Sequence, residues 1–161
     1  MKRIYALLII CTMGLTMSFT TAHYAKKGVK EAKELKWYNW NEGYPLGDKV
    51  DKIIMVDIYT SWCGWCKRLD HDTYSNPDVI DMLSKDFITI KLNPEEKDIK
   101  YLLDKQELSG GALVNALTNG GTSGYPTIVF IYPKKKEVFF KAGYQDAKTF
   151  KNTLETVLAK K

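Results

Sequence analysis

The chain contains few residues of the two types that most often hold metals or form cross-links: three cysteines and two histidines among 161 residues. Small secreted scaffolds that depend on disulfides are rich in cysteine, so this chain does not belong to that class. A structural zinc site needs four ligands, and only His23 and His71 could join a cysteine pair. A c-type haem site is excluded because Lys67, not histidine, follows the second cysteine of the only close pair.

The chain also lacks a dense stretch of charge of one sign. Its formal net charge is +5, and its 24 lysines and arginines are spread along the sequence. The one cluster, at 134–136, follows Pro133 and is typical of a solvated turn. We therefore expect no nucleic-acid partner. With 45% hydrophobic residues, the chain is long enough for one domain with a core of its own.

The first 22 residues resemble a targeting segment rather than part of a fold. Lys2 and Arg3 precede an apolar stretch, and small residues end at Ala22, which predicts a signal peptide over 1–22. A retained membrane anchor over 4–22 is the alternative. Removal of the segment would take Cys11 with it and leave Cys63 and Cys66 as the only thiols.

Hydrophobic periodicity and turn residues predict an α/β domain over 50–161, preceded by a lead-in over 23–49 with a short strand at 36–40 and turns after it. Within the domain, strands are expected at 53–60, 87–92, 127–132 and 137–142, the last two as a hairpin. Helices are expected after the cysteine pair, after the capping residues Asn76 and Asp146, at 95–108 and within 110–124. This order favours a central mixed sheet with helices on both faces, and a helical insertion before the third of these strands.

The segment SWCGWCKRLD, residues 61–70, carries the chemistry. A disulfide closed over two residues removes little entropy from the unfolded chain, so a purely structural role is disfavoured. Cys63 would stand at the start of a helix, where unpaired amides and the helix dipole stabilise a thiolate. Cys63 would attack a substrate disulfide, and Cys66, one turn later, would resolve the mixed disulfide.

The sequence resembles the thioredoxin superfamily over about 50–160, and the resemblance rests on four features. IIMVDIYTSWCGWCK is similar to the active-site strand and helix; IKLN at 90–93 to the strand beside it; GYPT at 124–127 to the cis-proline loop; KAGY at 141–144 to the end of the last strand. The resemblance implies a thioredoxin-like fold. It also implies that Asp57 is a buried acid that manages the proton of Cys66, with Lys91 as its partner. A solvent-facing strand lysine is the alternative for Lys91.

The same resemblance implies that Tyr125, a cis-Pro126 and Gly143 line the substrate groove. Trp62 and Trp65 are expected either as an apolar lip around the disulfide or as partly buried cover, and Tyr125 either as a contact or as packing. Trp65 stands where ordinary thioredoxin has proline, so both directions of electron flow stay open. The stretch 94–124 is longer than a minimal thioredoxin needs.

We therefore expect an exported, monomeric thiol–disulfide oxidoreductase of the cell envelope, acting on protein disulfides. It would need a redox partner at the membrane but no organic cofactor and no metal, because the Cys63–Cys66 pair is itself the redox centre. Two alternatives remain: a carrier of Cu(I), which thiolates bind well, and a binding domain in which the cysteine pair is incidental.

Overall fold

The computed structural model describes residues 34–121 and 124–161. The signal peptide expected over 1–22, with Cys11, and the first part of the lead-in, with His23, lie outside the described residues. No helix within the described ranges is both long enough and apolar enough to cross a membrane.

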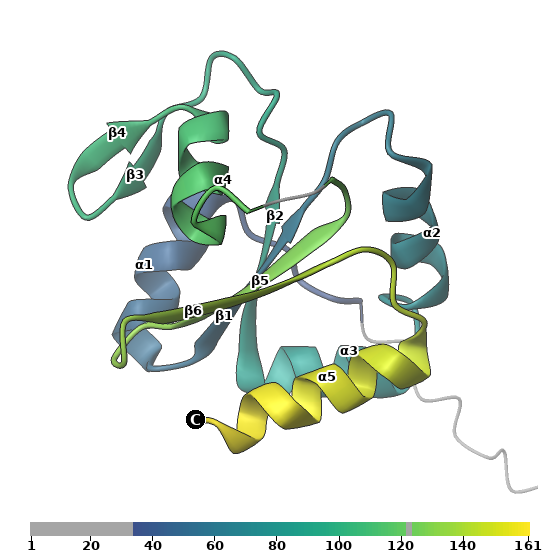
Figure 1. Ribbon diagram of the computed structural model, residues 1–161. Coiled ribbons are helices and arrows are strands. Elements are labelled where there is room, and N and C mark those ends of the chain that lie inside the picture. Colours follow the sequence, from purple (N-terminus) through teal and green to yellow (C-terminus); the bar gives the residue numbers. More distant parts are fainter. Residues whose placement is uncertain (1–33, 122–123) are drawn as a thin grey trace, which may run out of the picture. The chain divides into compact units, whose positions relative to one another are not determined.

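A four-stranded mixed sheet in the order β2-β1-β5-β6 forms the centre (Figure 1). Its strands are β1 (Ile53–Ile58), β2 (Phe87–Leu92), β5 (Thr127–Tyr132) and β6 (Glu137–Ala142). β1 runs parallel to β2 and antiparallel to β5, and β5 runs antiparallel to β6. Every residue of β1 and of β5 is buried, as expected for central strands covered on both faces. The four strands occupy the predicted segments, and β1 ends two residues early.

Helices cover the sheet on both faces, which confirms the expected α/β class. Side chains of α2 (Gly64–Asp72), α3 (Pro77–Asp86) and α5 (Ala147–Ala159) pack with Met55 and Phe130 on one face. Those of α1 (Trp40–Val50) and α4 (Gly110–Thr118) pack with Val56 and Ile90 on the other. Local signals placed three of these helices correctly: Asn76 and Asp146 cap α3 and α5, and Cys63 caps α2.

The strand predicted at 36–40 and the turns after it are wrong: Tyr38 forms only an isolated bridge with Ile90, and α1 begins at Trp40. The glycines that suggested turns lie on the buried face of this helix. A Cβ atom at Gly43 would stand 2.5 Å from Ile90 Cγ1, and one at Gly47 would stand 2.2 Å from Ile54 Cγ1. These residues therefore permit close helix–sheet contact. Residues 40–49, assigned above to the lead-in, are packed on β1 and β2.

The helix predicted at 95–108 is also wrong. This segment contains a two-stranded hairpin, β3 (Tyr101–Leu103) and β4 (Gln106–Leu108), with Asp104 and Lys105 both at positive φ in its turn. The apolar residues that suggested a helical stripe do not form one, since Ile99 and Leu102 are exposed while Tyr101 is buried. The second predicted helix of the insertion is confirmed as α4, which Ser109 caps.

Candidate redox site

Cys63 and Cys66 form a disulfide at the N-terminus of α2, with a Cα–Cα distance of 5.3 Å. Cys63 is the N-cap residue, and its Sγ accepts a hydrogen bond from the backbone N–H of Cys66 at 3.0 Å. The sulfur of Cys63 therefore lies where the free amides of the first helical turn converge. Both cysteines are almost completely buried.

Two exposed tryptophans flank the disulfide. Trp62 is 66% exposed and Trp65 is 55% exposed, although large apolar side chains usually leave the solvent. Trp62 contacts the edge of the Tyr125 ring at a centroid distance of 5.9 Å, and its indole N–H donates to the Glu95 carboxylate at 3.0 Å. Of the two alternatives for the tryptophans, the structure therefore favours the exposed lip.

The Tyr125–Pro126 peptide bond is cis, as the resemblance implied. The N–H of Gly143, at φ 91°, donates to the carbonyl of Pro126 at 2.8 Å. Because Tyr125 contacts Trp62, the residue before Cys63, this loop lies beside the disulfide. We call the five residues that the sequence suggested around the disulfide the rim: Trp62, Trp65, Tyr125, Pro126 and Gly143.

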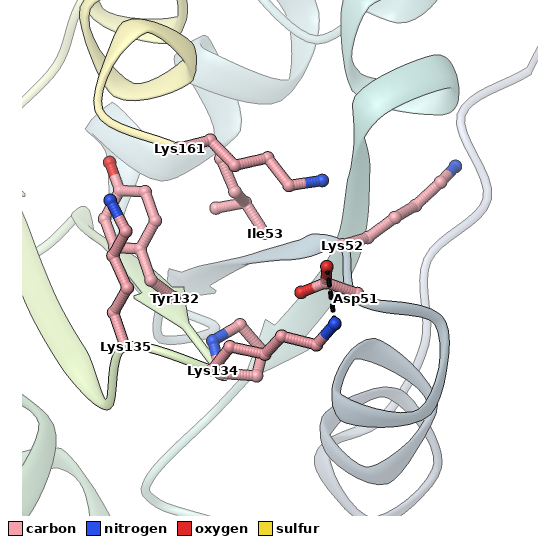
Figure 2. A pocket seen from close by; sticks show the side chains of 8 residues that line it. Asp51, Lys52, Ile53, Tyr132, Lys134, Lys135 and Lys161 are labelled. Atoms are coloured by element: carbon pink, nitrogen blue, oxygen red, sulfur yellow. Dashed lines mark ion pairs between the residues drawn. The ribbon is translucent and has the colours of Figure 1, made fainter.

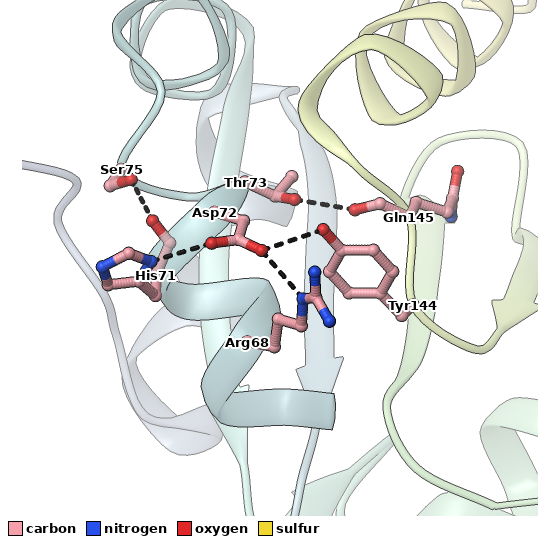
Figure 3. A network of polar contacts seen from close by, with 7 residues as sticks. All are labelled: Arg68, His71, Asp72, Thr73, Ser75, Tyr144 and Gln145. Carbon is pink, nitrogen blue, oxygen red and sulfur yellow. Dashed lines mark hydrogen bonds and ion pairs between the residues drawn. The ribbon is translucent and has the colours of Figure 1, made fainter. Parts of the chain in front are cut away.

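A polar network connects α2 to the loop after β6 (Figure 3). Tyr144 stacks at a tilt against Trp65 with a centroid distance of 5.4 Å, and the Arg68 guanidinium lies over both rings. Asp72 accepts hydrogen bonds from Arg68 and from the Tyr144 hydroxyl and contacts His71. Hydrogen bonds from His71 and Arg68 lower the pKa of Asp72, so its carboxylate stays charged. The loop after β6 is thereby fastened to the helix that carries the cysteines.

Thr73 adds a second connection in the same place, because its hydroxyl donates to the carbonyl of Gln145 at 2.7 Å (Figure 3). Gln145 in turn accepts from Thr153 of α5 at 2.6 Å. The end of α2, the loop after β6 and α5 are therefore joined by hydrogen bonds that are buried from solvent. Sequence reasoning missed this network; the one signal that could have indicated it is that Tyr144 follows Gly143 directly.

Asp57 and Lys91 face each other across the parallel pair of β1 and β2. The Lys91 ammonium lies 2.5 Å from Asp57 Oδ2 and also forms an ion pair with Asp70 of α2. Since one ammonium reaches both carboxylates, Asp57 projects from the sheet face that α2 covers. Asp70 follows Cys66 by one helical turn and lies on the same side of α2 as Cys66. The buried acid and the second cysteine are thus on the same side of the sheet.

Burial dominates the electrostatics of Asp57. Its side chain has no solvent exposure, and this desolvation raises its pKa to about 6 even though the charge and hydrogen bond of Lys91 lower it. Burial lowers the pKa of Lys91, but the carboxylates of Asp57 and Asp70 outweigh it and the net pKa is raised. Lys91 is therefore a charged partner of a carboxyl that can exchange its proton near neutrality, and not the solvent-facing alternative.

Three aromatic rings surround the Lys91 ammonium. The ring centroids of Trp37, Tyr59 and Tyr74 lie 4.7, 5.1 and 5.2 Å from Nζ. Such faces stabilise a cation where water is scarce. Trp37 packs both at the edge of the core and against this cation.

A basic hollow of about 230 Å³ lies where β1 begins at Ile53 and β5 ends at Tyr132, away from the end of β1 that leads to the cysteines (Figure 2). Lys52, Lys134, Lys135 and Lys161 line it, and Lys134 pairs with Asp51 at 3.0 Å. It shares no residue with the redox site. In the part of the chain that the structure describes, no group of three or more His, Cys, Asp or Glu side chains could hold a metal ion.

The structure thus brings the sequence-predicted residues together in pairs: Cys63 with Cys66, Asp57 with Lys91, Trp62 with Tyr125, and Pro126 with Gly143. Sequence reasoning missed Asp70, Glu95 and the rings around Lys91. For Asp70 a signal was present, because it stands four residues after Cys66 on a predicted helix.

Parts of two longer proteins resemble this chain in sequence. The human Spermatogenesis-associated protein 20 is 30% identical over 98 residues, which are 60% of this chain and 12% of that protein. The Thiol:disulfide interchange protein DsbD of Haemophilus influenzae is 28% identical over 115 residues, 70% of this chain and 18% of that protein. The chain therefore spans less than a fifth of the length of either relative.

The solution structure of a thioredoxin from Thermus thermophilus superposes with a TM-score of 0.61 at 21% identity, over 80% of this chain and 90% of that one. This likeness shows the thioredoxin-like fold that the sequence predicted. Residues 16–160 match the family Thioredox_DsbH, described as "Protein of unknown function, DUF255". The chain has a thioredoxin-like fold with a disulfide between the cysteines of its CxxC motif, and it belongs to the Thioredox_DsbH (DUF255) family.

Proposed function

We propose that the protein is a thiol–disulfide oxidoreductase that acts on protein disulfides through Cys63 and Cys66. The observation that carries the proposal is the disulfide at the N-terminus of α2, set between two exposed tryptophans. A structural disulfide needs no exposed aromatic surface beside it, whereas a redox pair needs a surface on which a partner protein docks.

Cys63 acts as the nucleophile. As the N-cap of α2 its sulfur accepts a backbone hydrogen bond, and the same amides and helix dipole stabilise a thiolate after reduction. The thiolate attacks one sulfur of a substrate disulfide, forms a mixed disulfide and releases the other substrate sulfur as a thiolate.

Cys66 resolves the mixed disulfide, and Asp57 takes its proton. The S–H bond of Cys66 breaks, the proton passes to the Asp57 carboxylate, and the new thiolate attacks Cys63 Sγ. The Cys63–Cys66 disulfide forms and the second substrate thiolate leaves, so that the substrate gains two electrons and the pair loses two. A base with a pKa of about 6 suits this proton transfer near neutral pH.

The rim binds the substrate. Trp62 and Trp65 offer apolar contact on the two sides of the disulfide, and the backbone of Tyr125 pairs with an extended substrate segment in the manner of an added strand. The network of Arg68, Asp72 and Tyr144 holds Trp65 in place for this contact.

We place this activity in the cell envelope, with the signal peptide removed and the protein monomeric. The segment expected over 1–22 and the similarity to Thiol:disulfide interchange protein DsbD support this location. A reductase needs electrons delivered from a redox partner at the membrane, because compartments outside the cytoplasm are oxidising. No organic cofactor is needed.

Trapping of the mixed disulfide tests the proposal. In a Cys11→Ser background, reduced Cys66→Ser protein is mixed with a model protein disulfide and its mass is measured without reductant. We expect a covalent complex through Cys63 that dithiothreitol removes. The matched Cys63→Ser variant should form at least tenfold less complex. Equal trapping by the two variants, or none by either, would sink the assignment.

A further inference from the structure

The Lys91 ammonium is shared between two carboxylates with very different surroundings. Asp57 has no exposed surface, whereas the side chain of Asp70 is 49% exposed, and that of Lys91, between them, is 20% exposed. The three side chains come from β1, β2 and α2, so they form a row from the sheet interior to the surface.

This row ends in a hollow of about 640 Å³ beside α2. Asp70 and Lys91 form part of its lining, together with Glu34, Trp37 and Tyr74. No rim residue and neither cysteine contributes to it. Solvent in the hollow therefore reaches the outer end of the row, and a substrate that covers the disulfide and the rim does not block this access.

The two oxygens of Asp57 differ. Oδ2 is held by Lys91 at 2.5 Å, while no donor from the described residues reaches the buried Oδ1. Buried carboxylate oxygens are normally hydrogen-bonded. Oδ1 is thus the oxygen with an open position for a proton.

We propose that Asp70 competes with Asp57 for the Lys91 ammonium and that Asp70 and Lys91 together form the proton exit of the redox site, on a side that a bound substrate leaves open. Asp70 is a positioning residue in this scheme, because it touches neither the cysteines nor the substrate. The inference rests on the proposed function, in which the proton comes from Cys66.

Resolution of the mixed disulfide frees one proton from Cys66, and this proton has to leave the site. Cys66 loses a proton to Asp57 Oδ1 during resolution. Lys91 then releases one ammonium proton to water in the hollow and takes the proton of Asp57 in its place, so that Asp57 ends ionised and Lys91 ends with its charge unchanged. Asp70 pulls the ammonium outward, and its negative charge raises the pKa of Asp57. Besides the three members of the row, the titratable groups next to it are Glu34, Tyr59 and Tyr74, and Cys66 lies on the same side of the sheet.

Titration of the Asp57 carboxyl by carbon-13 NMR tests the competition without any activity assay. The oxidised protein is used, so that Cys66 carries no proton, and Asp57→Asn assigns the signal. We expect the Asp57 midpoint to move to lower pH in Asp70→Asn, because Lys91 then serves Asp57 alone and a neighbouring negative charge is gone. Lys91→Met should move the midpoint to higher pH. Asp70→Glu, which keeps a carboxylate at this position, should show the same midpoint as the wild type.

The control is Asp98→Asn, an exposed aspartate outside the site, which should leave the midpoint in place. An unchanged or raised midpoint in Asp70→Asn would overturn the competition. The titration does not depend on turnover, so it stands even if the wild-type protein proves inactive and the proposed function fails.

The exit is tested in the mixed disulfide of Cys66→Ser with a model peptide. Asp57 should still titrate reversibly there, because the peptide occupies the rim and not the hollow. Loss of the titration on peptide attachment would mean that protons pass through the rim, and would refute this part of the proposal.

Discussion

Asp57 is a carboxyl group without solvent contact, and its burial makes the folded protein bind a proton more tightly than the unfolded chain does. Its pKa is raised from 3.8 to about 6 on folding. Between pH 3.8 and about pH 6 the folded state therefore holds more protons than the unfolded chain, so the free energy of unfolding falls as the pH rises through this range. The loss is complete above about pH 6 and amounts to about 3 kcal/mol for a shift of about two units.

The Asp57→Asn variant should therefore be more stable than the wild type at pH 7, by up to about 3 kcal/mol, and equal to it near pH 4. Urea unfolding of both oxidised proteins between pH 4 and pH 7 measures this difference. The asparagine keeps the shape and an oxygen for Lys91 but cannot ionise. A variant that is less stable than the wild type at pH 7 would show that the ion pair with Lys91 outweighs the burial of the charge.

The site residues differ in how far sequence could predict them. Cys63 and Cys66 stand at a helix start that local sequence predicts, and Asp57 stands six residues before Cys63 in the adjoining strand, where the family resemblance implied a buried acid. Only the family resemblance implied the partner Lys91, because its place opposite Asp57 depends on the register of a neighbouring parallel strand. Asp70 and Trp37 could not be assigned in this way, because their roles depend on side chains from three separate elements that meet at one ammonium group.

Among the helices and strands, α1 shows why glycine and proline led to a wrong prediction of turns. In sequence they indicate turns, and in this helix the glycines permit contact with Ile90 and Ile54 of the sheet. The hairpin β3–β4 has a similar cause: the Trp40 indole donates to the Leu102 carbonyl at 2.8 Å, across 62 residues. The strands and caps that sequence placed correctly depend on neighbours in the chain, whereas these two elements depend on distant ones.

The Gly47→Ala substitution tests the packing of α1. Its Cβ would stand 2.2 Å from Ile54 Cγ1, so either the Ile54 side chain or the helix must shift, and we expect a loss of about 1–3 kcal/mol in the free energy of unfolding. Denaturant titration measures it. The matched control is Gly111→Ala in α4, where a Cβ meets nothing within 4 Å and helix propensity predicts a gain of up to about 1 kcal/mol. Equal effects at the two positions would contradict the close contact.

Across the whole molecule, the proposed thiol chemistry and the proposed proton exit lie at different points along one helix. The rim and the disulfide lie at the N-terminus of α2, and the Lys91 hollow lies farther along the same helix, at Asp70. The basic hollow at the other end of β1 shares no lining residue with either. A partner protein can therefore cover the rim while Lys91, the ion-pair partner of the buried base Asp57, still faces the solvent in its hollow.

The equilibrium reduction potential of the Cys63–Cys66 pair shows whether this disulfide is a redox pair or a structural one. The Cys11→Ser protein is equilibrated with glutathione buffers of stated poise, and the oxidised fraction is read by mass spectrometry after thiol alkylation. For a redox pair we expect rapid exchange and a potential between about −270 mV, as in thioredoxin, and about −120 mV, as in strong oxidants. A potential well below about −300 mV with slow exchange would identify a structural disulfide and would contradict the account.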